Sequence, residues 1–193
     1  MQAVSGENRG ARFAALPHVG EADHPEGEIP WSSAAAWREC RLSLEMTIAA
    51  AGAGLDPARA MASRIVHCYD LAGDLFDALA EASCGRCRRP CCLDARVWLD
   101  FKDLLVIHLS GQSPPPAQLR GNRRERCLYL ASNGCTLPRG KRPWVCTWYI
   151  CPAQRRVLTR DIPRGPERLA KWWQEIAALR EAMEEAFLTV AHR

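Results

Sequence analysis

The chain has 193 residues, of which 48% are hydrophobic and 25% are charged. This is a size at which one domain buries a proper core without disulfide staples. The N-terminus lacks the charged start and apolar stretch of a signal peptide, and the longest apolar run, LLVIHL, is far shorter than the roughly 18 residues of a membrane helix. We therefore expect a cytoplasmic protein with no membrane partner.

The net charge of +4 hides a division along the chain. Residues 84–164 contain 16 Lys or Arg against 5 Asp or Glu, a balance of +11, while the remaining residues contain 10 against 17, a balance of −7. The basic segment is also the segment that contains most of the cysteines. Its positive charge has two physical interpretations: it offsets metal-bound thiolates, or it attracts a polyanion.

Two long helices are predicted in the first half of the chain. Residues 1–30 have no sustained periodicity and are predicted to form a flexible leader. From Ser32, apolar residues recur at three- and four-residue steps until the sequence GAG, which predicts a helix of about 20 residues. Asp56 as N-cap and Pro57 in the first turn predict a second helix that ends near Ser83. Residues 31–83 are thus predicted to form a two-helix scaffold.

Short elements are predicted in residues 84–152. The sequence RVWL is typical of a short strand, and Asp100 with Asp103 predicts an N-terminal cap for the helix FKDLLVIHLS, which Gly111 would close. The sequence QSPPPAQ is interpreted as a linker. Two short extended pieces around Asn133-Gly134, and a tight turn or a single helical turn after Pro143, complete this region.

A third long helix is predicted from Pro166 to the C-terminus, because apolar residues again recur at helical spacing. Residues 153–193 are therefore interpreted as a linker followed by a helix that packs on the scaffold. The predicted fold class is mainly α: a helical bundle-like scaffold with an inserted, irregular, cysteine-rich metal-binding module that contains short strands.

Ten cysteines need an explanation in a chain of this kind. Disulfides do not persist in the reducing cytoplasm, so we do not expect a disulfide framework. Cys40 and Cys68 lie at apolar helical positions and are interpreted as small core hydrophobes. The other eight fall within 68 residues and are the predicted metal ligands: Cys84, Cys87, Cys91, Cys92, Cys127, Cys135, Cys146 and Cys151.

The spacing of these cysteines favours a metal site. Cys84 with Cys87, and Cys146 with Cys151, are separated by loops that let two sulfurs converge on one ion. Cys91 and Cys92 are adjacent, and consecutive side chains point in different directions, so both rarely bind the same ion. Eight thiols permit two four-cysteine sites, one site with spare cysteines, or a polynuclear cluster. Zinc and iron-sulfur clusters both accept four thiolates, so the cofactor stays open between them.

The block CGRCRRPCC, followed by CLYLASNGCTLPRGKRPWVCTWYIC, resembles the YkgJ-type cysteine-cluster family, which is described as a zinc- or iron-chelating domain. The likeness covers residues 84–151 and includes the Cys-Cys pair, the glycine before Cys135, and Arg142-Pro143 ahead of Cys146. It departs from the C-x2-C-x2-C-C order of the family, because three residues separate Cys87 from Cys91. The resemblance implies metal binding without a settled activity. Some similar proteins are associated with lysine methylation of flagellin, which would imply methyl transfer.

Four further residues are predicted to support the cofactor. Arg142 is expected either to bond a backbone carbonyl or to neutralise a thiolate, while Trp144 and Trp148, together with Tyr149, are expected to shield the centre from water. The predicted partners are the metal ion or cluster and a protein partner of unspecified kind. Two alternatives stay open: an iron-sulfur-dependent enzyme, and a zinc module that binds nucleic acid through its basic segment.

Overall fold

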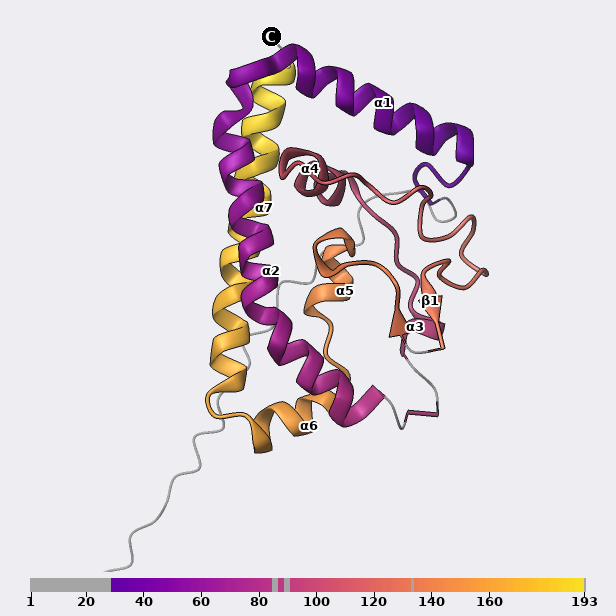
Figure 1. Cartoon of the computed structure of the whole chain (residues 1–193), viewed down its shortest axis with the longest axis vertical. Helices are drawn as coiled ribbons and strands as arrows, with labels where there is room; N and C mark the ends of the chain where they lie inside the picture. Colours follow the sequence, from indigo (N-terminus) through magenta and orange to yellow (C-terminus); the bar gives the residue numbers. More distant parts are fainter. Residues whose placement is uncertain (1–28, 85–86, 89–90, 133, 193) are drawn as a thin grey trace, which may run out of the picture.

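The computed structural model describes residues 29–84, 87–88, 91–132 and 134–192. Two long helices, α2 (Asp56–Ser83) and α7 (Gly165–Ala191), pack side by side along the length of the molecule (Figure 1). Helix α1 (Ala34–Ala51) crosses one end of this pair, and α6 (Pro152–Asp161) crosses the other. The predicted mainly helical fold is confirmed, whereas the predicted leader lies almost wholly outside the described residues.

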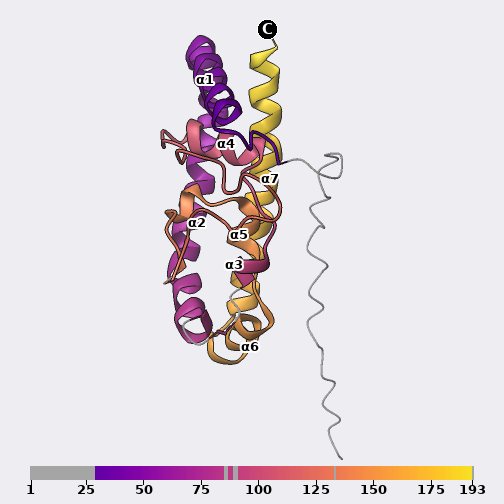
Figure 2. The same ribbon diagram turned by 90° about the vertical axis from the view of Figure 1, so that its right-hand side faces the viewer.

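The remaining elements occupy the space on one side of α2 and α7. They are α3 (Cys91–Asp94), α4 (Phe101–Leu109), the strands β1 (Leu130–Ala131) and β2 (Gly134–Cys135), a 3-10 turn at Arg139–Lys141, and α5 (Trp144–Trp148). Viewed from that side, α4, α5 and α3 follow one another down the molecule in front of the two long helices (Figure 2). Residues 91–148, called the middle region below, are therefore built from short elements that pack against the long helices.

The N-cap side chain bonds the first turn in α1, α4 and α6, whereas it makes no such bond in α2, α5 and α7. The Ser33 hydroxyl accepts a hydrogen bond from the Ala36 backbone N–H at 3.1 Å, which fixes the start of α1. The prediction that Asp56 is the N-cap of α2 is wrong. A 3-10 turn, Gly52–Leu55, runs directly into the helix, so Leu55 takes the cap position and Asp56 is already helical. Its carboxylate instead pairs with Arg59 at 2.9 Å.

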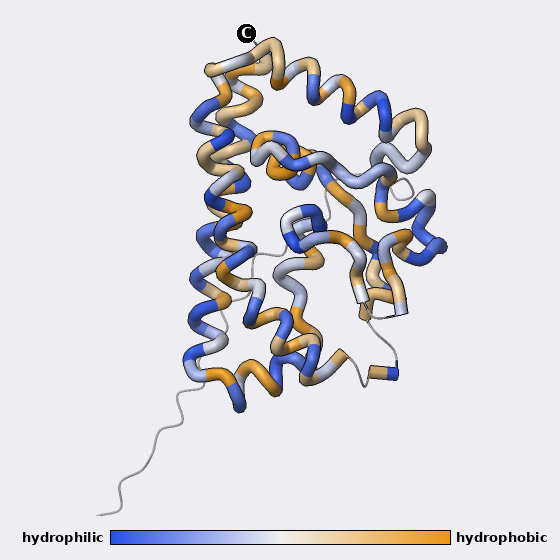
Figure 3. Tube along the Cα trace, in the orientation of Figure 1, coloured by the Kyte–Doolittle hydropathy of each residue, from blue (hydrophilic) through white to orange (hydrophobic). Residues whose placement is uncertain are grey.

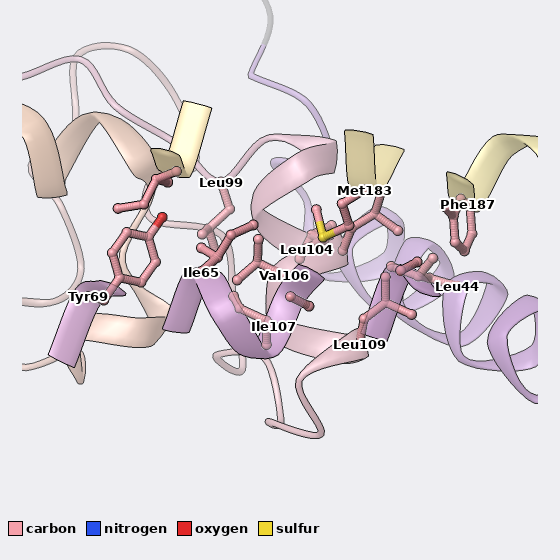
Figure 4. Packing of buried hydrophobic residues seen from close by; sticks show 14 of the residues in the cluster. Leu44, Ile65, Tyr69, Leu99, Leu104, Val106, Ile107, Leu109, Met183 and Phe187 are labelled. Atoms are coloured by element: carbon pink, nitrogen blue, oxygen red, sulfur yellow. The ribbon is translucent and has the colours of Figure 1, made fainter. Parts of the chain in front are cut away.

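The main core lies where α2, α4 and α7 meet. Helix α4 is the centre of this core because it is apolar on nearly all sides, as expected for a short helix enclosed by others. Figure 4 shows Leu104 and Val106 of α4 in the space between Ile65 of α2 and Met183 of α7. A second, smaller cluster joins the far end of α2 to α6 and α7 through Leu79, Leu158 and Leu169.

Apolar and polar residues alternate along the long helices, as the hydropathy colouring of Figure 3 shows. Each helix buries a stripe and leaves a charged face in water. Within the described ranges, no helix combines the length and the apolar character that are needed to cross a bilayer.

The connection after α4 is held in place by one amide side chain. Gln118 is buried, and its oxygen accepts bonds from the N–H groups of Leu99 and Leu119, both at 2.9 Å. Its nitrogen donates to the carbonyls of Leu99 at 3.0 Å and Pro30 at 3.2 Å. These four bonds satisfy the amide fully. The segment predicted as a linker is therefore anchored to the scaffold at its end.

Two further sequence predictions for local structure are wrong. Residues 96–99, predicted as a strand, are extended without a strand partner, because the backbone of Leu99 is bonded to the Gln118 side chain. The predicted linker after Cys151 is helix α6, which Pro152 at its first position and a Cys151–Gln154 capping box begin. The predicted hairpin, the single turn of helix after Pro143 and the capping box of Asp100 and Asp103 are confirmed.

A buried ion pair joins α7 to α4 and α5. Arg180 and Asp103 are only 3% and 4% exposed, and the guanidinium donates to Asp103 Oδ1 at 2.7 Å. It also bonds the carboxylate of Asp100 at 3.1 Å and 3.2 Å. Asp103 Oδ1 accepts a further bond, from the backbone N–H of Trp144 at 3.0 Å. Burial raises the pKa of Asp103, and the positive charge of Arg180 opposes that shift.

We predict that Arg180→Met lowers the free energy of unfolding by about 3–5 kcal/mol, because it leaves the Asp103 carboxylate buried without its cation. Urea denaturation of wild type and variant measures this difference. Arg64→Met is the matched control, since the Arg64–Glu175 pair lies at the surface and is expected to contribute at most about 1 kcal/mol. Equal effects of the two substitutions would contradict the importance of the buried pair.

Candidate metal centre

The eight clustered cysteines are distributed over seven elements or connections. All of them are free thiols. Cys84 caps the end of α2, Cys91 and Cys92 begin α3, Cys135 lies in β2, Cys146 in α5, and Cys151 caps α6. The two others lie in connections: Cys87, whose N–H donates to the Cys84 carbonyl at 3.0 Å, and Cys127, whose carbonyl accepts from Leu130 at 3.2 Å.

The hairpin that carries Cys135 is attached to the anchored connection before it. The Tyr129 hydroxyl donates to the carbonyl of Ala117 at 3.0 Å and accepts from the N–H of the same residue at 3.2 Å. Leu128 donates its backbone N–H to Leu119 at 2.8 Å. Since Ala117 and Leu119 flank the buried Gln118, these bonds fix the two strands relative to the scaffold. Cys127 and Cys135 are placed by the same contacts.

Helix α5 is placed by hydrogen bonds at its start. The Trp144 N–H donates to Asp103, which satisfies one of the free donors at a helix N-terminus. The Arg142 side chain donates from Nε to the Leu137 carbonyl at 2.9 Å and so closes the turn ahead of the helix. The Cys146 N–H donates to Pro143 at 2.9 Å. Cys146 therefore lies in the first turn of a helix whose start is fixed to the scaffold by the bond between Trp144 and Asp103.

Cys127, Cys135 and Cys146 form an electrostatically interacting set. Burial raises the pKa of Cys127, and the charge of Cys135 raises it further. Burial also raises the pKa of Cys146, with added repulsion from Cys135, Asp103 and Cys127. Cys146 as a residue is exposed, so its shift reflects the density of protein around the thiol rather than full enclosure. These sulfurs lie near one another although up to 19 residues separate them in sequence.

Positive groups lie beside the same thiols. Arg142 lowers the pKa of Cys146, and Arg120 lowers that of Cys127, in each case against the larger effect of burial. Arg120 is itself buried and bonded to the carbonyl of Ala95. A fixed guanidinium near a thiol favours the thiolate, which is the form that binds a metal.

The adjacent cysteines Cys91 and Cys92 differ in character. A hydrogen bond between the two thiols raises the pKa of Cys91 and lowers that of Cys92. The charges of Cys146, Cys135 and Cys84 act on Cys92 in the opposite direction. Cys92 is therefore within electrostatic range of thiols from α2, β2 and α5.

The last cysteine, Cys151, is held at the start of α6. Its sulfur accepts from the Gln154 N–H at 3.4 Å, and its own N–H donates to Gln154 Oε1 at 3.2 Å. The pKa of Tyr149 is raised by burial and by the charges of Cys91 and Cys151. Tyr149 thus lies beside both of these thiols.

The four residues that were predicted to support the cofactor have different surroundings. Arg142 bonds a backbone carbonyl, as one of its two expected roles required, and its charge opposes the effect of burial on the pKa of Cys146. Trp148 stacks edge-on with Tyr149, with ring centroids 6.4 Å apart, close to Cys91 and Cys151. Trp144 packs into the scaffold instead, against Tyr69 at 6.4 Å and Arg180 at 5.9 Å.

The donor set fits a thiophilic metal in its chemistry, because thiolates with nearby cations suit zinc and iron-sulfur clusters alike. The geometry brings these donors into one region without completing a site. Across the described ranges, no three His, Cys, Asp or Glu side chains converge closely enough to hold an ion. The assignment of the eight cysteines as ligands therefore stays a prediction.

Sequence reasoning missed two residues that organise this region. Gln154 contacts Cys151 and Cys84, and its signal in the sequence is a capping box with Cys in place of Ser or Thr, at Cys151-x-x-Gln154. Arg180 pairs with Asp103, 77 residues away in sequence. It lies within α7, and no local sequence pattern marks it as buried. Only a three-dimensional arrangement reveals that second contact.

Comparison of the chain with models of protein families, with curated proteins and with solved structures found no match.

We predict that thiol labelling separates the two classes of cysteine. Cys68 has an exposed fraction of 0% and a pKa raised by burial, so it should stay unlabelled by maleimide until the protein unfolds. Cys92 is exposed and has a lowered pKa, so in metal-free protein it should react early. Mass spectrometry of peptides after timed labelling measures both. Labelling of Cys68 as fast as Cys92 would contradict the packing of α2.

Proposed function

We propose that this protein binds zinc or an iron-sulfur centre through the thiolates of its cysteine cluster. The observation that carries the proposal is the electrostatic contact between Cys92 and thiols from α2, β2 and α5, in a region where every cysteine is free. Burial, with added repulsion from neighbouring cysteines, raises the pKa of Cys127 and of Cys146, so their thiolate forms are unfavourable unless a positive charge offsets theirs. A bound cation supplies that offset.

The alternative of a nucleic-acid-binding module receives less support, because many arginines of the basic segment have internal partners. Arg142 bonds the backbone, Arg139 pairs with Asp77, and Arg123 lies over the Trp98 ring at 5.5 Å. Guanidinium groups engaged in this way are not available for phosphate contacts. We therefore propose metal binding alone as the primary function, with a redox or methyl-transfer role depending on iron as its cofactor.

Anaerobic purification from the natural host, followed by elemental and sulfide analysis, tests this proposal. Brown protein with stoichiometric iron and sulfide supports the iron-sulfur centre, and colourless protein with stoichiometric zinc supports the zinc site. Protein that contains neither metal nor sulfide, and that takes up neither on reconstitution, would overturn the proposal.

We predict that Cys146→Ser and Cys151→Ser each release metal and destabilise the protein, because a buried or clustered thiolate is lost from the ligand set. Cys40→Ser is the control, since Cys40 is half-buried against the scaffold core and should neither release metal nor lower stability as strongly. Metal per chain, measured by plasma mass spectrometry, is the readout. Unchanged metal content in both cluster variants would refute the ligand assignment.

Removal of the metal should lower stability by a calculable amount. A ligand that binds only the folded state, at a free concentration 100 times its Kd, adds about 2.7 kcal/mol to the free energy of unfolding. We therefore expect the urea midpoint to rise with free zinc or on cluster reconstitution, and to fall with chelator. A midpoint that does not change with metal would show that the bound form is no more stable than the free form.

A further inference from the structure

Gln154 makes contacts with two cysteines that lie at opposite ends of the cysteine-bearing segment. It stands in the first turn of α6, where its backbone N–H and Oε1 complete the capping box with Cys151. Its Nε2 lies 3.7 Å from the sulfur of Cys84, at the end of α2. One side chain thus bridges residues that are separated by 67 positions.

The orientation of this amide is determined by its surroundings. The Cys151 N–H requires an acceptor, so the oxygen of the amide must face Cys151. The amide nitrogen, a donor only, then faces Cys84. The Ser83 hydroxyl lies 3.8 Å from the same sulfur. That hydroxyl already donates its one proton to the Leu79 carbonyl at 2.6 Å. The Gln154 amide is therefore the neighbour of Cys84 that can donate to a thiolate, although Cys84 is exposed to solvent.

Such an arrangement exceeds what capping requires. A capping box needs only the contacts between Gln154 and Cys151, and a glutamate would supply the same acceptor. The amide nitrogen adds a donor directed at a second sulfur, and donors to ligand atoms orient metal ligands and tune their basicity. The packing of α2 against α6 through Leu79 and Leu158 keeps the two helix ends together.

From these contacts we infer that Cys84 and Cys151 bind the same metal ion or cluster, with Gln154 as the positioning residue that holds both sulfurs. This inference rests on the proposed metal binding and adds to it a defined ligand pair. It also assigns the first and last cysteines of the cluster to one centre, which their separation in sequence does not suggest.

Metal stoichiometry tests the shared centre. Cys84→Ser, Cys151→Ser and the double variant are reconstituted with zinc or with iron and sulfide, and bound metal is counted per chain. The inference expects all three to lose the same amount of metal. A double variant that loses the sum of two separate single losses would overturn it. Wild-type protein that binds no metal would overturn the proposed function as well, so the two failures are distinguishable.

Gln154→Glu tests the positioning role. Glutamate keeps the acceptor for the Cys151 N–H but replaces the donor to Cys84 with an oxygen, so the melting temperature of metal-free protein should change little. Zinc affinity, measured by competition with a chromophoric chelator, should fall 10- to 100-fold. Gln174→Glu, at an exposed position of α7, is the charge-matched control and should leave affinity unchanged.

Cobalt provides the independent readout. The intensity of the thiolate-to-cobalt charge-transfer band should be lower in Gln154→Glu than in wild type, and Gln154→Glu should cause no further loss in a Cys84→Ser background. Wild-type affinity and spectrum in Gln154→Glu would restrict Gln154 to capping and overturn the positioning role. Additive losses in the Cys84→Ser background would overturn its action through Cys84.

Discussion

The arrangement of the middle region depends on the buried contact between Arg180 and Asp103. Two opposite charges that are almost completely removed from water are stable only when both are fully bonded, and this pair meets that condition through Asp100 and the Trp144 N–H. The same carboxylate therefore caps the turn that carries Cys146 and receives the cation from α7. The position of Cys146, a proposed ligand, thus depends on the packing of α7, a helix that contains no cysteine.

The surplus of positive charge in residues 84–164 is partly explained by its internal partners. Arg120 bonds the backbone near α3, and Arg142 bonds the turn before α5. Arg139 lies against Phe76 with its charge 5.2 Å from the ring centroid and pairs with Asp77 on α2. These arginines attach the middle region to the scaffold. Their bonds do what backbone hydrogen bonds between strands would do in a protein with a larger sheet. Two of them also lie near thiols, so one residue type serves both packing and charge balance.

The sequence alone predicts the elements whose signals are local. Helical periodicity gives α1, α2 and α7, the Asp100 and Asp103 pattern gives the start of α4, and Asn133-Gly134 gives the hairpin. It does not predict α6, because four of its ten residues are charged and its apolar stripe is narrow. Nor does it predict which cysteines lie together. Proximity between α2, β2, α5 and α6 arises from contacts such as Leu79 with Leu158, whose partners are distant in sequence.

The polar links that join scaffold and middle region span long stretches of chain. Gln118 reaches Pro30 across 88 residues, Trp37 bonds the Pro115 carbonyl across 78, and Arg180 reaches Asp103 across 77. Contacts of this kind slow folding, because loop closure costs entropy before the contact is made. On the ribosome, all ten cysteines emerge before α7 does. The thiols are therefore made before the helix that completes their scaffold, and during this interval they are open to solvent and to oxidants.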